Sequence, residues 1–174
     1  PQSEGTRVKA AVLHRLGEPL SIEDVDLAEP AAGEVLIDVA AAGLCHSDLH
    51  YMEGTYSTEL PAVLGHESAG VVAAVGREVS EVAPGDHVIT SLSVFCGSCP
   101  YCRADTPYLC ARREATQRQP GQPARLSRDG QQLHQFLNLS SFAERMLVHE
   151  NAVVKIDPAM PLDRAALLGC GVAT

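Results

Sequence analysis

The sequence has no tryptophan, and aromatic residues make up only 4% of its 174 residues. Val, Leu and Ala must therefore fill the core, and a hydrophobic content of 45% over this length suffices for one core and one domain. Long apolar runs are also missing, because stretches such as residues 10–13 and 39–42 are far shorter than the roughly 20 residues of a membrane span. Residues 1–5 show no signal-peptide pattern, so we expect a cytoplasmic protein.

Positive charge is scarce as well. The chain has 13 Lys and Arg residues against 22 Asp and Glu residues, which gives a formal net charge of -9. Such a charge opposes nonspecific attraction to nucleic acid and to anionic membranes. We therefore expect neither of these polyanions as a partner.

Cysteine, in contrast, is concentrated in one short segment. Cys96, Cys99, Cys102 and Cys110 have the spacing C-x2-C-x2-C-x7-C, which is typical of a closed tetrahedral zinc site. Disulfide bonds and redox-active thiols are the alternatives. A secreted disulfide scaffold is usually shorter and denser in cysteine, and C-x2-C spacing favours a metal. The sequence predicts a structural zinc lobe at about residues 93–113.

A second and more open set of metal-ligand residues surrounds this lobe in the sequence. Cys45, His66 and Cys170 supply three ligands, which leaves one position of a catalytic zinc free for water or substrate. Glu67 is expected to approach the metal from outside the ligand set. Asp48 is expected to orient the His66 ring through its second nitrogen.

The distribution of turn residues indicates the fold. Strand-like runs at residues 8–14, 34–40, 69–75 and 87–91 are separated by glycine and proline, which predicts an all-β barrel or sandwich. A brief helix is expected at 46–53, further strands at 141–149 and 152–156, and a short helix at 162–168. Residues 111–132 are rich in Arg, Gln, Pro and Gly, and we expect a polar, solvated loop there, although its arginines could also bind an anion.

Several segments together resemble one known family. Residues 65–70 (GHESAG), 43–48 (GLCHSD), 84–88 (PGDHV) and 169–171 (GCG), with the four-cysteine lobe between them, stand in the order of the zinc alcohol dehydrogenases. These enzymes belong to the medium-chain dehydrogenase/reductase superfamily. The resemblance runs from about residue 7 to the end of the chain.

The resemblance implies that residues 1–174 form a GroES-like β-barrel catalytic domain with two zinc ions. The catalytic zinc would be held by Cys45, His66 and Cys170, and the structural zinc by the four-cysteine lobe. The parent enzyme would oxidise an alcohol or reduce an aldehyde with NAD or NADP, as a homodimer or homotetramer.

The resemblance also assigns roles to individual side chains. Ser47 would accept the alcohol proton and His50 would pass it to solvent through a cofactor hydroxyl. His46 would contact the cofactor pyrophosphate and Thr174 the nicotinamide. The alcohol pocket would be lined by Tyr56, Leu92 and Phe136. Without the resemblance, Ser47 could be a helix cap, His50 a surface residue and Phe136 a core residue. The remaining histidines are interpreted as structural: His14, His87, His134 and His149.

A dinucleotide-binding motif is not recognisable. Residues 169–171 imitate the start of a G-x-G-x-x-G turn, but Thr174 stands where the third glycine belongs and no strand precedes them. We expect the Rossmann cofactor domain to be absent from this chain, which alone should bind zinc and show little hydride transfer. Two other functions remain open, namely a thiol-dependent formaldehyde dehydrogenase and a non-enzymatic, zinc-stabilised GroES-like module.

Overall fold

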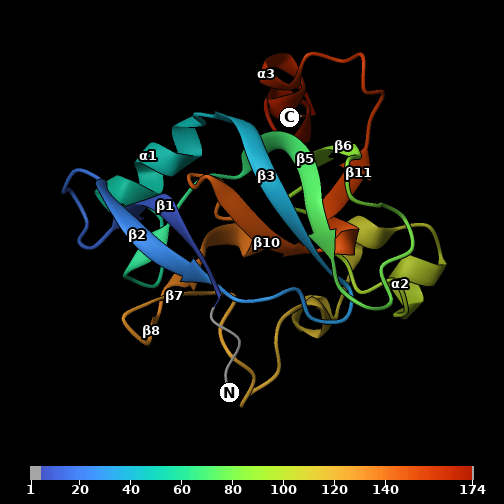
Figure 1. Cartoon of the computed structure of the whole chain (residues 1–174), viewed down its shortest axis with the longest axis horizontal. Coiled ribbons are helices and arrows are strands. Elements are labelled where there is room, and N and C mark those ends of the chain that lie inside the picture. Colours follow the sequence, from blue (N-terminus) through green and yellow to red (C-terminus); the bar gives the residue numbers. More distant parts are fainter. Residues whose placement is uncertain (1–4, 174) are drawn as a thin grey trace.

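The computed structural model describes residues 5–173, and two antiparallel-rich sheets form its body (Figure 1). The first sheet has, in spatial order, the strands β8 (Gln131–Gln132), β7 (Leu126–Arg128), β2 (Ser21–Leu27), β1 (Thr6–Leu13), β4 (Ala62–Val63) and β9 (His134–Gln135). The second has β10 (Arg145–His149), β3 (Glu34–Gly43), β5 (Glu67–Val75), β6 (His87–Thr90) and β11 (Val153–Lys155). The expected mainly β barrel is confirmed.

The two sheets are joined where the chain approaches β10. Ala10 forms a β-bridge with Ala143, and the Ala11 N–H donates to the Phe142 carbonyl at 2.8 Å. Because these contacts continue the hydrogen bonding of β1 toward β10, the sheets form a barrel that is nearly closed. Closure of this kind protects strand edges from pairing with other chains.

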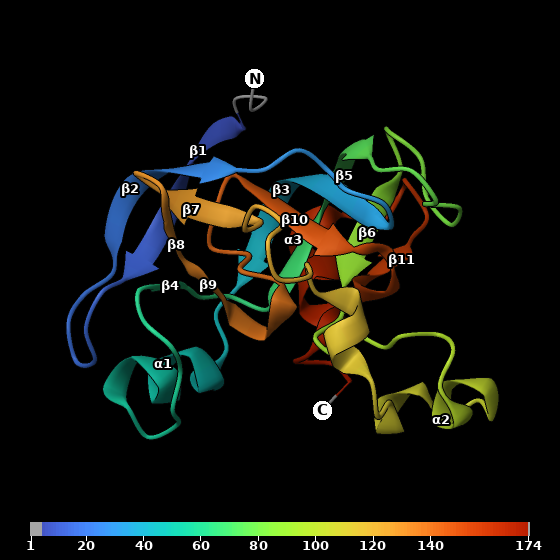
Figure 2. The same ribbon diagram turned by 90° about the horizontal axis from the view of Figure 1, so that it is seen from below.

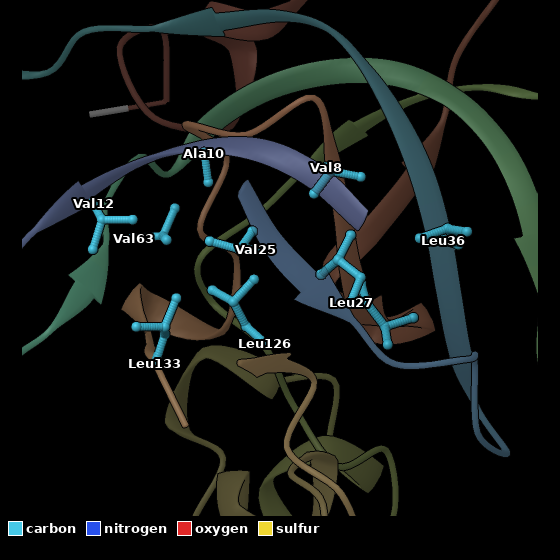
Figure 3. Close-up of a cluster of buried hydrophobic side chains, with 10 residues drawn as sticks. Val8, Ala10, Val12, Val25, Leu27, Leu36, Val63, Leu126 and Leu133 are labelled. Carbon is cyan, nitrogen blue, oxygen red and sulfur yellow. The ribbon is translucent and has the colours of Figure 1, made fainter. Parts of the chain in front are cut away.

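The core is built mainly from aliphatic side chains, many of them β-branched, as the low aromatic content requires. One buried cluster gathers residues of β1, β2 and β7, including Val8, Val25 and Leu126, which point toward one another in Figure 3. Successive residues of a strand face opposite sides of the sheet. Leu36 of β3 accordingly joins this cluster, while its neighbours Val35 and Ile37 join a second cluster with β5, β6 and β10. β3 is therefore covered on both faces.

In the part of the chain that the structure describes, three short α-helices lie outside the sheets. α1 (His46–Glu53) follows β3 and ends at Gly54, whose φ of 83° is the left-handed conformation that glycine tolerates. α2 (Pro100–Arg103) lies in the cysteine segment, far from α1 in both views (Figures 1 and 2). α3 (Leu162–Ala165) continues into a 3₁₀ turn (Ala166–Gly169) that packs on β5. Among the described residues, no helix has the length and apolar character needed to cross a bilayer.

The expectation for residues 111–132 was wrong in part. This segment contains a 3₁₀ turn (Arg113–Thr116) and the strands β7 and β8. Two of its arginines, Arg118 and Arg125, bind the carboxylate of Glu34, whose side chain is only 3% exposed. The arginines compensate a buried charge at the start of β3, so this part of the segment is fixed to the barrel rather than solvated.

Other differences from the prediction concern where strands and helices begin and end, and one strand that was not predicted. The strand expected at 141–149 begins only at Arg145, because the chain before it bends past Gly65 and Leu64 with backbone bonds from Ser141 and Phe142. β2 was not predicted, although its alternating pattern pairs with β1 along seven residues. The helix expected at 162–168 is half α-helix and half 3₁₀ turn.

Candidate metal centres

The cysteine lobe brings four sulfur atoms together. The Sγ atom of Cys102 lies 3.4 Å from that of Cys99 and 4.0 Å from that of Cys96, and Cys99 lies 4.0 Å from Cys110. Zinc–sulfur bonds of about 2.3 Å in a tetrahedron place the sulfurs roughly 3.8 Å apart. A disulfide would require about 2.05 Å, and no disulfide is formed among the described cysteines. The donor set and its spacing fit a closed zinc site.

Local backbone geometry closes the lobe round this point. Gly97 has a φ of 74°, and Pro100 occupies the first turn of α2, where its missing N–H leaves no helical bond unmade. The N–H groups of Cys99 and Cys96 donate to sulfur, the first to Cys96 and the second to Cys110, each at 3.3 Å. Such bonds favour the thiolate form that a metal requires.

Without a cation, the pKa values of the lobe thiols shift in opposite directions. Hydrogen bonding from the Ser98 backbone lowers the pKa of Cys96 to about 6. Burial and the neighbouring Cys99 sulfur raise the pKa of Cys102 to about 11. Like charges at this spacing oppose one another, and a divalent cation among them removes that opposition.

The second centre unites residues that are far apart in the sequence. Ligand atoms of Cys45, His66, Glu67 and Cys170 all lie within 4.8 Å of one another. Cys45 follows β3, His66 directly precedes β5, Glu67 is its first residue, and Cys170 follows the turn after α3. Gly43 of β3 pairs with Glu67 of β5, so the sheet register itself brings the first three side chains together.

Asp48 organises this centre from the first turn of α1. Its carboxylate accepts the Cys45 N–H at 3.1 Å, the Gly65 N–H at 3.3 Å and the His66 Nδ1–H at 3.3 Å. The Nδ1 bond fixes the ring, so that Nε2 carries the lone pair available to a metal. Asp48 is 4% exposed, and its contacts couple the start of α1 to two of the ligands.

The pKa values of the two thiols of this centre are shifted in opposite directions. Burial alone would raise the pKa of Cys45, but hydrogen bonds from Ser47 and the nearby His66 outweigh it and lower that pKa. Burial and the negative Cys45 sulfur raise the pKa of Cys170 to about 11. Burial would lower the pKa of His66, yet its bond to Asp48 raises it. A bound cation would bring all three groups to their ligating forms.

Glu67 lies closer to the ligand set than its sequence position suggested. Its carboxylate belongs to the group of atoms within 4.8 Å, so it is a candidate fourth ligand. Two glycines make room for it: a Cβ at Gly43 would overlap Glu67 Oε2, and one at Gly171 would lie 3.4 Å from Oε1. These glycines are the sequence signal that could have revealed its place.

The residues predicted to move a proton lie on α1 beside the centre. The hydroxyl oxygen of Ser47 is 3.6 Å from the Cys45 sulfur. The His50 ring, one turn later, lies 4.7 Å from the ring of His46 and 5.2 Å from that of Tyr56, centre to centre. Its Nδ1 is buried and has no hydrogen-bond partner within the described part of the chain. Thr174 lies outside the described residues.

The predicted pocket residues are only partly brought together. Phe136 is 1% exposed in a core cluster and its ring centre lies 6.0 Å from that of His66. Tyr56 is half exposed, and Leu92 packs against the cluster of β3, β5 and β6. Sequence reasoning missed Tyr51, whose ring centre is 4.6 Å from that of Phe136. Tyr51 and Phe136 border a cavity of about 410 Å³, which is also lined by Ser57, Thr58, Glu59, His134 and Leu137.

Comparison with known proteins identifies the architecture that carries these centres. The family model of the alcohol dehydrogenase GroES-like domain matches residues 31–158. The chain belongs to this family. This GroES-like domain is the N-terminal domain type of the zinc-dependent alcohol dehydrogenases, so the resemblance seen in the sequence is confirmed.

Relatives of the domain are consistent in length and fold. An NDMA-dependent alcohol dehydrogenase of Amycolatopsis methanolica is 44% identical over 171 residues, covering 97% of this chain and 46% of that protein. An alcohol dehydrogenase zinc-binding domain protein from Burkholderia ambifaria superposes with a TM-score of 0.87 at 40% identity, over 96% of this chain and 46% of that one. A benzyl alcohol dehydrogenase from Acinetobacter calcoaceticus superposes with a TM-score of 0.85 at 33% identity, over 96% of this chain and 46% of that one. The chain thus spans about half the length of these relatives.

Proposed function

We propose that this domain is the metal-binding catalytic half of a zinc-dependent alcohol dehydrogenase, which converts an alcohol reversibly to an aldehyde or ketone with NAD or NADP. The observation that carries the proposal is the second centre, where Cys45, His66 and Cys170 converge beside Ser47. A purely structural metal site has no use for a neighbouring hydroxyl and imidazole. This argues against the alternative of a non-enzymatic module.

The donor set of this centre fits zinc. Two thiolates and one imidazole are borderline-soft ligands, and three protein ligands leave a position for substrate. When bound there, zinc would polarise the alcohol oxygen and favour its deprotonated form. Asp48 would hold His66 in the ligating tautomer, and the Glu67 carboxylate would lie beside the three ligands.

The proton would leave through side chains of α1. Ser47 Oγ would accept the alcohol proton, and the imidazole of His50 would take it onward to solvent through a cofactor hydroxyl, since imidazole titrates near neutral pH. The unpaired Nδ1 of His50 is available for such a bond. His46 would contact the cofactor pyrophosphate, and Tyr56, Leu92 and Phe136 would line the alcohol pocket.

The cofactor requires a further domain. In the described residues, the only parallel strand pair is β4 with β9, two residues each, which is not a dinucleotide-binding βαβ unit. We therefore propose that NAD is bound by a Rossmann domain of the same parent protein, and that residues 1–174 alone transfer little hydride. The homodimer or homotetramer and the cytoplasmic location stay predictions.

A thiol-dependent formaldehyde dehydrogenase is less well supported. Its anionic thiol adduct could have used the arginines of residues 111–132. Arg118 and Arg125, however, are bound to Glu34 at the start of β3, whereas the open centre lies beyond the other end of that strand. An assay of formaldehyde oxidation with and without glutathione or mycothiol separates the two functions, since only the alternative requires the thiol.

The first test measures zinc per chain by elemental analysis. We expect two zinc ions in the wild type and about one in Cys170→Ser, with the lobe still loaded. Cys99→Ser is the matched control, which should lose the other ion. One zinc in the wild type, unchanged by Cys170→Ser, would refute the second centre.

The second test uses the parent protein that includes the cofactor domain. Alcohol oxidation should be measured with NAD, with NADP and in the presence of NDMA, for the wild type, Ser47→Ala and His50→Gln. Loss of general acid–base assistance typically costs 10² to 10⁴ in rate, so we expect a fall of about this size for Ser47→Ala. Unchanged kcat in both variants would exclude the proposed proton path.

A further inference from the structure

A second cavity lies at the end of the barrel opposite the open metal centre formed by Cys45, His66 and Cys170. It has a volume of about 310 Å³ and is bordered by the segment before β3, the residues after β5, and residues 115–125. β3 has ten residues, and at about 3.3 Å per residue the two ends of this strand are roughly 30 Å apart. The cavity is therefore separate from the catalytic centre.

The charges on this cavity do not cancel. Its lining includes three guanidinium groups, of Arg77, Arg118 and Arg125, but only one carboxylate, of Glu34. Glu34 is shared, since Arg125 Nε donates to its Oε1 at 2.6 Å and Arg118 Nη2 to its Oε2 at 2.6 Å. Within the lining, three positive charges face one negative charge, and the Glu150 carboxylate, which acts on His149 from outside the lining, offsets only part of this excess. This is an exception in a chain whose net charge is -9.

Two donors on the lining are not consumed by the fold. The Arg77 guanidinium forms no ion pair or side-chain hydrogen bond with any described residue, and Arg77 is solvent-exposed. The Nδ1 atom of His149 accepts the Asn151 N–H at 3.1 Å, so the ring in its neutral form carries its hydrogen on Nε2. Gly33 leaves space beside that atom, because a Cβ there would lie 3.3 Å from Nε2.

The remaining guanidiniums are held rigidly in place. Arg125 also donates to the Thr116 carbonyl at 2.6 Å and to Gln135 at 3.2 Å, and its side chain is 6% exposed. Arg118 donates to the Pro123 and Glu29 carbonyls. Their positions are thus fixed before any ligand arrives, which reduces the entropy cost of binding.

From this arrangement we propose that the cavity is a binding site for a divalent tetrahedral oxyanion, either free phosphate or the phosphate group of a monoester. Arg77 and His149 Nε2–H would contact the oxyanion directly, and the field of Arg118 and Arg125 would favour a charge of -2. Guanidinium forks match phosphate oxygens in geometry. The volume is about ten times the roughly 30 Å³ that one water occupies in the liquid, so the anion enters with part of its hydration.

The test is isothermal titration of the zinc-loaded chain with inorganic phosphate, glycerol 3-phosphate and acetate at low salt. Saturable binding of either phosphate compound, at least tenfold tighter than acetate, is expected. Binding of only the ester would identify a monoester as the ligand, and binding of both would identify free phosphate as sufficient. Absence of saturable phosphate binding, or acetate binding as tight as phosphate, would overturn the proposal.

Variants locate the site. Arg77→Gln should weaken phosphate binding at least tenfold, whereas Arg15→Gln should leave it unchanged, because Arg15 is 79% exposed and pairs only with Glu18. In NMR spectra the His149 ring signals should shift on titration, while those of His14, which is bound to Glu23, should not. An anion bound instead at the open metal centre would be insensitive to Arg77→Gln, and that result would refute the assignment.

Discussion

Glu34→Gln should be among the most destabilising isosteric changes in this domain. The Glu34 side chain is 3% exposed, and four donors bind its two oxygens: Arg118 twice, Arg125 once and the Ala31 N–H once. Glutamine keeps the shape but removes the charge and turns one acceptor into a donor that faces a guanidinium. Two largely buried cations then lose their counterion.

The magnitude follows from the burial of the group. Removing one partner of a buried ion pair typically costs about 3 to 5 kcal/mol, while a whole domain is stable by about 5 to 15 kcal/mol. Urea unfolding of the zinc-loaded chain at pH 7 measures this loss. Asp26→Asn is the matched control, because Asp26 pairs with Arg7 at the surface and should contribute no more than about 1 kcal/mol.

The pH dependence of the same variant gives a second readout. Burial would raise the pKa of Glu34, but hydrogen bonds from Arg118, Ala31 and Arg125 outweigh it and hold that pKa below its ordinary value. A lowered native pKa means that the stabilisation is complete above the unfolded value of about 4.3 and is lost as pH falls through the native one. The stability gap between wild type and Glu34→Gln should therefore stay constant from pH 8 to 5 and narrow below that. A gap at pH 7 no larger than that of Asp26→Asn would refute the reasoning.

Three further changes probe other parts of the domain. Asp48→Asn should weaken zinc binding at the second centre about 10- to 100-fold in a chelator competition, because His66 loses its orienting carboxylate; equal affinity would contradict this. Phe136→Ala should cost about 3 to 5 kcal/mol in urea unfolding, and a loss below about 1 kcal/mol would show that the ring is not part of the core. Cys102→Ser should remove one zinc and raise the rate of amide hydrogen exchange in residues 93–113, while the strands stay protected. If exchange instead rose only in the strands of the barrel, zinc would not stabilise the lobe locally.

What the sequence predicted well is what depends on short spacing. The four lobe cysteines lie within one short segment, so their convergence needs no knowledge of the fold. Glycine and proline marked most of the strands of the second sheet. Cys170, in contrast, reaches the centre only because α3 and its 3₁₀ turn pack on β5, and its inclusion rested on three-ligand chemistry and the resemblance.

Charges were harder to place than cysteines. The sequence does not indicate that Glu34 is buried. It also does not indicate that Arg118 and Arg125, which follow Glu34 by 84 and 91 residues, neutralise its charge. A charge run is as compatible with a solvated loop as with a buried network, and only the fold decides between them. Glu67 is similar, since its closeness to the ligands depends on its pairing with Gly43.

The two metal centres also differ in how much chain must be closed to form them. The lobe ligands run from Cys96 to Cys110, whereas those of the other centre run from Cys45 to Cys170. The entropy of loop closure grows logarithmically with length, which makes the longer closure about 2 kcal/mol more costly before any packing compensates it. During refolding in the presence of zinc, the lobe should therefore load first and the second centre only once the barrel has assembled. Stopped-flow zinc uptake should show one fast and one slow equivalent, with only the slow one lost in Cys170→Ser, so that zinc loading of the second centre reports the completion of the fold.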